Sequence, residues 1–382
     1  MNELAAKNPS RRSANLELLR ILSMVMIITL HYLLQGGVLE AAPLGSLNYY
    51  IVWVAEALCY VSVNCFVLIS GYFLVTSRFK WKRFLELVFQ VLFYSITIYL
   101  VFCLAGVSEF QLSSLLSGYL FLLTHGQFWF ITAYLALYLI FPFLNILIHG
   151  LTKTKYLKLL LVLFVLFSFI PTVFFFSTDI MGIKGGYSLG WFVFLYLIGG
   201  YIRLHRVEKK NAKGKNLLLY FAMTAVVVLA KVAQQVLFPK LLGTQTEYWD
   251  FYRYNSVFVL IGSVALFLFF LKISIKKESA SRWICAISSV TFGIFLIHTH
   301  YVTREWIWDD LLKPYEYAES NWLVLHLVGS VAVVFVACGL LEKLRYYLFR
   351  LIRFDLLLEK LINVLSFIEK ACFSKLCKRG EK

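Results

Sequence analysis

The chain has 382 residues, of which 60% are hydrophobic and 15% are charged, and its mean hydropathy is +0.76. Soluble proteins average about 45–50% apolar and about 25% charged residues, so this composition excludes a soluble enzyme and indicates an integral membrane protein. The formal net charge of +16 is compatible with nucleic acid or with an anionic membrane surface as a partner.

Ten segments are long and apolar enough to be membrane helices, since a span needs about 20 mostly apolar residues. The N-terminus before them is polar and basic and no small-residue cleavage site follows, so we expect the first span to remain as an anchor. The predicted fold is all-α, a polytopic bundle of about ten transmembrane helices. We place the membrane domain at 16–341, between an N-terminal segment 1–15 and a tail 342–382. The predicted spans are 16–34, 49–75, 84–105, 127–149, 156–176, 187–204, 216–238, 255–272, 283–302 and 321–341.

Lysine and arginine gather on one side of this bundle. If the N-terminus is inside, the segments on that side hold 31 of the 37 cations: 1–20, 76–83, 150–158, 203–215, 272–282 and 342–382. This asymmetry predicts that both termini are cytoplasmic, in a multi-pass protein of the cell membrane. Anionic lipid headgroups on that side are then the partner of the basic residues, so the net charge does not require a nucleic-acid partner. The stretch 344–370 mixes cations with apolar residues at helical spacing and predicts a helix on the inner membrane face.

Metal and disulfide chemistry are not expected. None of the seven cysteines forms a C-x-x-C pair, and five of them lie in apolar runs. His298 and His300 are two residues apart, whereas a two-histidine zinc motif on a helix needs a spacing of four.

Ionisable residues inside membrane helices usually mark function. Arg20 and His31 are eleven residues apart in the first span, which on a helix is about 16–17 Å and just over three turns. One helix face therefore presents a cation near the inner side and an imidazole in the outer half. An imidazole is suited to general base catalysis. A structural histidine, and a Glu17–Arg20 pair that snorkels to the interface, are the alternatives. The ionisable residues within the spans are Glu17, Arg20, His31, Glu56, Lys231 and His298.

Two further stretches carry candidate binding groups. "TSRFKWKRF" (76–84) places four cations before the third span. They either reflect membrane topology alone or bind phosphate groups. "HGQFWF" (125–130) opens the fourth span with Gln127 and Trp129, an amide and an indole that suit hydrogen bonding to a sugar and stacking on it. An interfacial tryptophan is the alternative.

The chain resembles the acyltransferase-3 family of ten-helix membrane acyltransferases over about residues 12–341. The most specific stretch is "NLELLRILSMVMIITLHY", because the family has an arginine and a histidine separated by ten residues in its first span, here Arg20 and His31. The other similar stretches are "CFVLISGYFL" (65–74), "FWFITAYLALYLIFPFLN" (128–145), "WFVFLYLIGGYI" (191–202) and "SVTFGIFLIH" (289–298).

The resemblance implies transfer of an acyl group, usually acetyl, from cytoplasmic acyl-CoA to a hydroxyl of a cell-envelope polysaccharide or lipid-linked sugar. Acetyl-CoA is then a substrate, and no metal is needed. His31 and Arg20 are the implied catalytic residues, by direct transfer or through an acyl-histidine. The family's Arg-x-x-Arg motif corresponds to "KWKR", in which Lys80 replaces the first arginine and loses its bidentate fork.

The remaining site predictions follow from this assignment. Arg78, Lys80 and Arg83 are predicted to bind the coenzyme, and Glu17, Gln127, Trp129 and His298 to bind the acceptor. The main alternative function is a carrier or flippase for a sugar, glycan or amino acid, which ten spans and a polar passage also suit. A sensor or scaffold is a further alternative, which the intact Arg20 and His31 disfavour.

Overall fold

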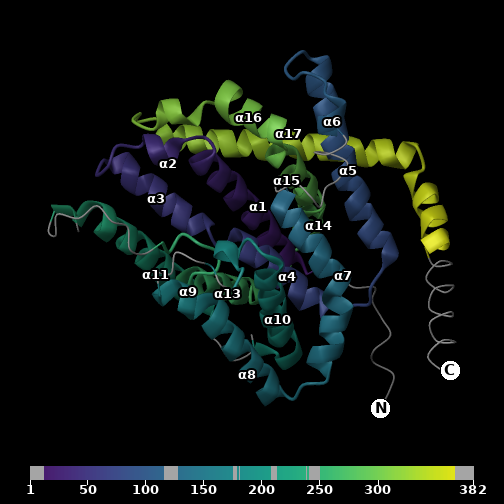
Figure 1. Cartoon of the computed structure of the whole chain (residues 1–382), viewed down its shortest axis with the longest axis horizontal. Helices are drawn as coiled ribbons and strands as arrows, with labels where there is room; N and C mark the ends of the chain where they lie inside the picture. The colour runs from purple at the N-terminus through teal and green to yellow at the C-terminus, as the bar shows by residue number, and fades with distance from the viewer. Residues whose placement is uncertain are drawn as a thin grey trace.

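The computed structural model describes residues 13–115, 128–174, 179, 181–207, 213–237, 239–240 and 250–365. Every regular element in these ranges is a helix, which confirms the predicted all-α class (Figure 1). Eight helical stretches are long and apolar enough to cross a membrane, and two shorter apolar helices accompany them. Each of the ten predicted spans corresponds to one of these ten stretches.

Four of the eight long stretches are uninterrupted α-helices, and the other four are interrupted or change helix type. The uninterrupted ones are α1 (Ala14–Leu34), α5 (Trp81–Leu104), α7 (Trp129–His149) and α17 (Leu323–Leu351), and α11 (Lys213–Val232) continues into a π-helical turn (Ala233–Leu237). The others are α3 with α4 (Leu47–Cys59, Ser62–Leu74), α8 to α9 (Lys153–Phe164, Ile170–Val173) and α14 with α15 (Glu278–Ser288, Thr291–Thr299). The two shorter helices are α10 (Leu189–His205) and α13 (Val257–Leu271).

Helix α1 lies at the centre of the bundle. It packs against α3, α4, α13, α14, α15 and α17, and Figure 1 shows it running between α3 and α15. Its first turn also caps the C-terminus of α13, because the Asn15 side-chain amide donates to the carbonyl oxygens of Phe270 (3.0 Å) and Leu271 (3.3 Å). The last carbonyls of a helix have no amide four residues later within the helix to bond with, so side chains often cap them. The helix that carries Arg20 and His31 is therefore fixed on several sides.

The close packing of α4 against α10 depends on glycine. A Cβ atom added at Gly71 would overlap the carbonyl oxygen of Tyr196, and one added at Gly199 would overlap that of Leu68. Small residues allow membrane helices to approach until their backbones touch. A buried network joins the same region to α13, since Asn64 accepts from Trp191 Nε1 (2.9 Å) and donates to the Tyr254 carbonyl (2.9 Å) and to Ser263 Oγ on α13 (3.2 Å).

Helix α17 runs past the predicted end of the last span at 341 and stops at Leu351. Between 341 and 351 the chain has no glycine or proline that would end a helix. The buried Glu342 attaches this part of α17 to α5, because it accepts from Tyr94 Oη (2.6 Å) and Gln90 Nε2 (3.1 Å) on α5. It also accepts from Arg345 on its own helix. Residues 354–365 are helical again, and the rest of the tail and residues 1–12 lie outside the described part.

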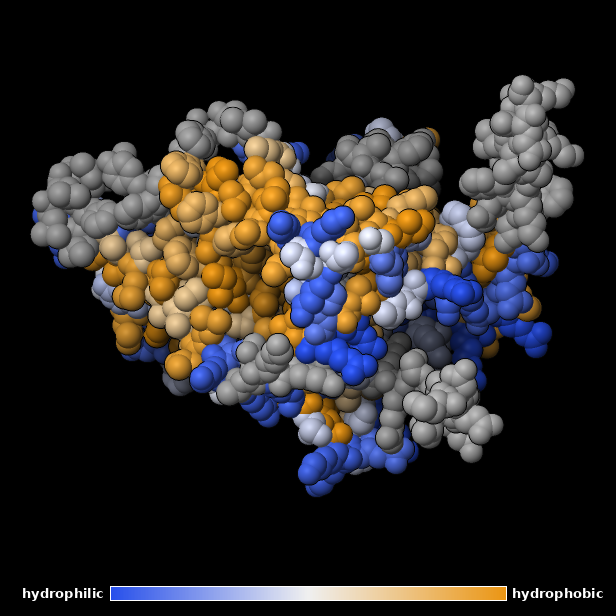
Figure 2. Space-filling view, turned by 90° about the horizontal axis from the view of Figure 1, so that it is seen from below, coloured by the Kyte–Doolittle hydropathy of each residue, from blue (hydrophilic) through white to orange (hydrophobic). Residues whose placement is uncertain are grey.

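The surface supports a membrane location. Figure 2 shows a broad hydrophobic face with hydrophilic side chains gathered along its margin. Large apolar side chains are exposed on α5, α8, α11 and α17, among them Leu104, Leu161, Leu229 and Leu344. An apolar surface of this extent is unfavourable in water and is the normal surface of helices in lipid.

Candidate active site

Arg20 and His31 lie on the single continuous helix α1, as the sequence predicted. Both side chains are partly exposed, although most of the residues between them are buried. Eleven residues of α-helix place the two groups about 16–17 Å apart along the axis. The candidate site therefore has an Arg20 end and a His31 end.

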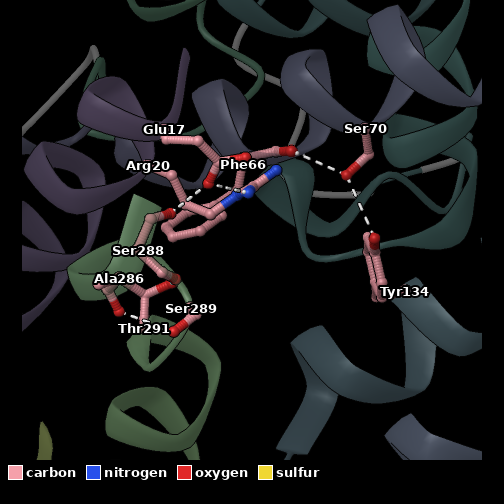
Figure 3. Close-up of polar contacts among 9 residues, drawn as sticks. All are labelled: Glu17, Arg20, Phe66, Ser70, Tyr134, Ala286, Ser288, Ser289 and Thr291. Atoms are coloured by element: carbon pink, nitrogen blue, oxygen red, sulfur yellow. Dashed lines mark hydrogen bonds and ion pairs between the residues drawn. The ribbon is translucent and has the colours of Figure 1, made fainter. Parts of the chain in front are cut away.

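At the Arg20 end, the buried carboxylate of Glu17 is the central acceptor. Its Oε2 atom accepts from Arg20 Nη1 at 2.6 Å and from the hydroxyl of Ser288, as Figure 3 shows. Glu17 is 4% exposed, whereas the side chain of Arg20 is 28% exposed. Glu17 thus fixes one edge of the guanidinium, and no other acceptor among the described residues bonds to it. A cation held in this way can receive an anion.

Sequence reasoning did not identify Ser288, Ser70 or Tyr134. Ser288 is the last residue of α14, at the break before α15, where the chain reads "SSVT". Ser70 on α4 donates to the Phe66 carbonyl (3.0 Å) and contacts Tyr134 Oη on α7 (3.3 Å), which Figure 3 also shows. Ser70 and Tyr134 lie within two of the stretches that resemble the family. A polar side chain within an apolar run was the one feature of the sequence that could have identified them as candidates.

At the His31 end, two imidazoles from distant parts of the chain meet. His31 Nδ1 lies 3.0 Å from Nε2 of His298, which is fully buried on α15. The other ring nitrogen of His298, Nδ1, lies 2.6 Å from the carbonyl oxygen of Ile294. The ring centroids of the two histidines are 5.0 Å apart.

These two contacts determine where the protons lie when both rings are neutral. A carbonyl only accepts, so His298 Nδ1 carries its proton and donates it to Ile294. His298 Nε2 is then an acceptor, and His31 Nδ1 must donate to it. The remaining nitrogen of His31, Nε2, keeps its lone pair. The arrangement therefore prepares His31 Nε2 to accept a proton or to attack a carbonyl carbon.

Trp129 lies in a group of aromatic residues rather than against His31. Its ring is 4.4 Å from that of Tyr187 and 6.0 Å from that of Tyr254, measured between centroids. A second series of ring contacts leads from its neighbour Phe130 to Phe295 (5.3 Å) and from Phe295 to His298 (6.1 Å). Gln127, the other residue predicted here, lies outside the described residues.

The predicted coenzyme-binding cations surround the start of α5. Arg78, Lys80 and Arg83 are all exposed, and Lys80 immediately precedes the first helical residue. Lys82 lies 3.5 Å from Asp355, so this cation has a partner from the C-terminal region. The exposed side chains and the amides of the first helical turn form a positive surface that suits phosphate groups.

His298 and His300 contact different partners. His298 bonds to His31, whereas His300 Nε2 lies 3.2 Å from the Ser95 carbonyl. In the part of the chain that the structure describes, no group of three metal-ligating side chains is found.

Comparison with known proteins gives a family and a distant relative. The family model described as "Acyltransferase domain", that of the acyltransferase-3 family, matches residues 13–342. A Staphylococcus epidermidis protein named "Probable poly-beta-1,6-N-acetyl-D-glucosamine export protein" is 26% identical over 165 residues, or 43% of this chain and 42% of the relative. The protein of the same name from a specified strain of that species matches equally. The alignment thus spans less than half of the relative, and no solved structure matches.

Proposed function

This chain belongs to the acyltransferase-3 family, and we propose that it transfers an acyl group, acetyl in the simplest case, from coenzyme A to a hydroxyl of a cell-envelope glycan. The observation that carries the proposal is the bond between His31 and His298, which leaves His31 Nε2 as an acceptor on the helix that also carries Arg20. The structure and the family support a membrane acyltransferase, and the donor and acceptor are our proposal.

The donor binds at the Arg20 end in this proposal. Counting α10 and α13 as spans gives ten crossings, with both termini and the exposed cations at 78–83 on the cytoplasmic side of the cell membrane. Coenzyme A carries several phosphate charges and is made in the cytoplasm. Arg78, Lys80 and Arg83 attract these phosphates, while Arg20 receives an anionic or polar group deeper in the bundle.

The acceptor binds at the His31 end. His31 Nε2 takes the proton of the acceptor hydroxyl, the oxygen attacks the thioester carbonyl, and the C–S bond breaks as the C–O bond forms. The proton then passes to the departing thiolate, which leaves as free coenzyme A. In the two-step form, His31 Nε2 attacks the thioester carbonyl and the C–S bond breaks, which releases the coenzyme as a thiolate. The acceptor hydroxyl then attacks the acyl-imidazolium, the C–N bond breaks, and the hydroxyl proton neutralises the thiolate. In both forms His298 fixes the orientation of the His31 ring and accepts a hydrogen bond from its Nδ1 atom. This bond stabilises the positive charge that develops on the His31 imidazole.

The experiment uses purified protein, acetyl-CoA and oligosaccharides released from the envelope polysaccharide of the producing cells. Release of the coenzyme thiol and O-acetyl content of the glycan are measured together. We expect both signals from wild type and neither from His31→Ala, whereas His149→Ala at the exposed end of α7 retains both. Equal thiol release and equal O-acetyl content with wild type and with His31→Ala, when both proteins are folded, would contradict the proposal.

The printed name of the relative favours a second candidate, export of a polysaccharide. An exporter moves unmodified glycan without coenzyme A. Proteoliposomes loaded with labelled oligosaccharide separate the two functions, because efflux without acetyl-CoA that persists in His31→Ala supports export.

A further inference from the structure

One side of α3, together with its C-cap residue, carries three aromatic residues and one acidic residue. Tyr49, Trp53, Glu56 and Tyr60 are spaced by four, three and four residues, which places them in a row along one side of the helix. The neighbouring helix α11 and its π-helical end add polar groups to this face, since the Lys231 ammonium lies 4.4 Å from the centre of the Trp53 ring and Tyr49 Oη donates to the Gln235 side chain. The function proposed above does not use this face.

The rings continue from α3 across the bundle as a connected series. Tyr252 packs on Trp53 at 5.0 Å and on Tyr60 at 6.0 Å, and Tyr254 packs on Tyr60 at 4.9 Å. Tyr187 then joins Tyr254 at 5.0 Å and Trp129 at 4.4 Å. We call this series the aromatic band: Tyr49, Trp53, Tyr60, Trp129, Tyr187, Tyr252 and Tyr254. It has both buried members and an exposed one, since Tyr187 is 40% exposed.

Glu56 is enclosed by the aromatic band. The residue is 4% exposed, and its carboxyl is close enough to the hydroxyls of Tyr60, Tyr187, Tyr252 and Tyr254 to interact with them electrostatically. Burial raises the pKa of the Tyr252 hydroxyl well above its usual value. The tyrosines in the loop before α13 therefore stay protonated and neutral.

Two buried polar atoms of this face have no hydrogen-bond partner among the described residues. They are Glu56 Oε2, an acceptor, and Trp53 Nε1, a donor. Buried polar atoms are nearly always bonded, and an exception indicates a bond that a ligand or an ordered water completes. Trp53 and Glu56 are three residues apart, so the free donor and the free acceptor lie on the same side of α3.

The chemistry of these atoms selects the ligand. A hydroxyl or an acetamido group both accepts from an indole N–H and donates to a carboxylate. An ammonium group can lie over the indole ring, as Lys231 does, but it has no acceptor for the indole N–H, and a phosphate has no donor for Glu56. Rings of tyrosine and tryptophan present flat apolar faces with polar edges, which match the alternating C–H faces and hydroxyl edges of a pyranose.

We propose that the aromatic band and Glu56 form a binding site for a neutral, hydroxyl-rich saccharide, the glycan acceptor. This inference rests on the proposed function for the reaction, but glycan binding can be measured without it. Phe130 and Phe295 link Trp129 to His298 through successive ring contacts, so a packed path joins the band to the end of the site where the hydroxyl is activated.

Kinetic tests use released envelope oligosaccharides as acceptor and measure the KM for acceptor and for acetyl-CoA separately. Glu56→Leu removes the acceptor atom and should raise the acceptor KM by roughly ten- to hundredfold, with the donor KM unchanged. Glu56→Gln keeps one acceptor oxygen and should raise it less. Tyr187→Ala should raise it by about two- to tenfold. The matched control is Tyr315→Ala, another exposed tyrosine at 44%, which lies outside the band.

A binding test separates this inference from the proposed function. Saturation-transfer NMR detects the same oligosaccharides on the His31→Ala protein, which needs no turnover. Loss of the signal in His31→Ala/Tyr187→Ala and in His31→Ala/Glu56→Leu, but not in His31→Ala/Tyr315→Ala, supports the band even if wild type transfers no acetyl group. Equal binding by all four proteins, or no binding by any, overturns it and leaves ordered water as the partner of Glu56.

Discussion

His31 and His298, 267 residues apart in the sequence, are joined by a contact of 3.0 Å between Nδ1 and Nε2. Because His298 is anchored to the Ile294 carbonyl, the direction of the hydrogen bond is fixed and the free nitrogen of His31 is Nε2. His298 is thus a positioning residue for His31, in addition to any contact with the acceptor.

We expect His298→Ala to lower kcat for acyl transfer by roughly ten- to hundredfold, since it removes one buried hydrogen bond to His31. His298→Gln should recover part of the loss, because its side-chain oxygen can accept from His31 Nδ1. The KM for acyl-CoA should stay the same, as we propose that the donor binds at the other end of α1. Steady-state kinetics of the two variants check this, and a glutamine variant no better than alanine would contradict the positioning role.

Glu17 and Arg20 give a second prediction. Glu17→Ala leaves Arg20 without its anchor and should raise the KM for acyl-CoA by roughly ten- to hundredfold. Ser288→Ala should have a smaller effect, because Arg20 keeps its bond to Glu17. Measured donor KM values for the two variants give the comparison.

The matched control for Glu17 is Glu342. It is equally buried and pairs with Arg345 three residues later, at 2.7 Å, but it fastens α17 to α5. Glu342→Ala should lower the thermal unfolding temperature in detergent without a specific rise of the donor KM. If both variants change stability alone, Glu17 has a structural role and the donor does not bind at Arg20.

Much of the helical architecture was predictable from hydropathy, because each span is a local feature of composition. The shared helix of Arg20 and His31 also followed from their spacing. The partners of these residues did not, since His298 and Ser288 belong to α15 and α14 and meet α1 only through tertiary packing. The predicted last span and the predicted helix after it are one continuous helix as far as Leu351, because no local signal breaks the chain between the apolar part and its amphipathic continuation.

Packing of α4 on α10 gives a prediction about stability. Gly71→Ala places a methyl group against the Tyr196 carbonyl, where backbone and not a flexible side chain would have to move. We expect a loss of about 1–3 kcal/mol, typical of overpacking, and a lower unfolding temperature. Gly329→Ala on α17 is the control, since nothing lies within 4 Å of the added atom. Equal unfolding temperatures for the two variants would contradict a backbone contact between α4 and α10 at Gly71.

The last prediction concerns the cations at the start of α5. Arg83→Ala should raise the KM for acyl-CoA by roughly ten- to hundredfold, the range for loss of one charge-assisted contact. Lys82→Ala should do less, because Lys82 lies near Asp355 and has its charge partly compensated. Added salt should weaken donor binding in wild type more than in Arg83→Ala, since screening acts on the contact that the variant has lost. If the donor KM is unchanged in Arg83→Ala and in Lys80→Ala/Arg83→Ala, these cations serve membrane topology alone, and the coenzyme must bind elsewhere even if His31 keeps its role.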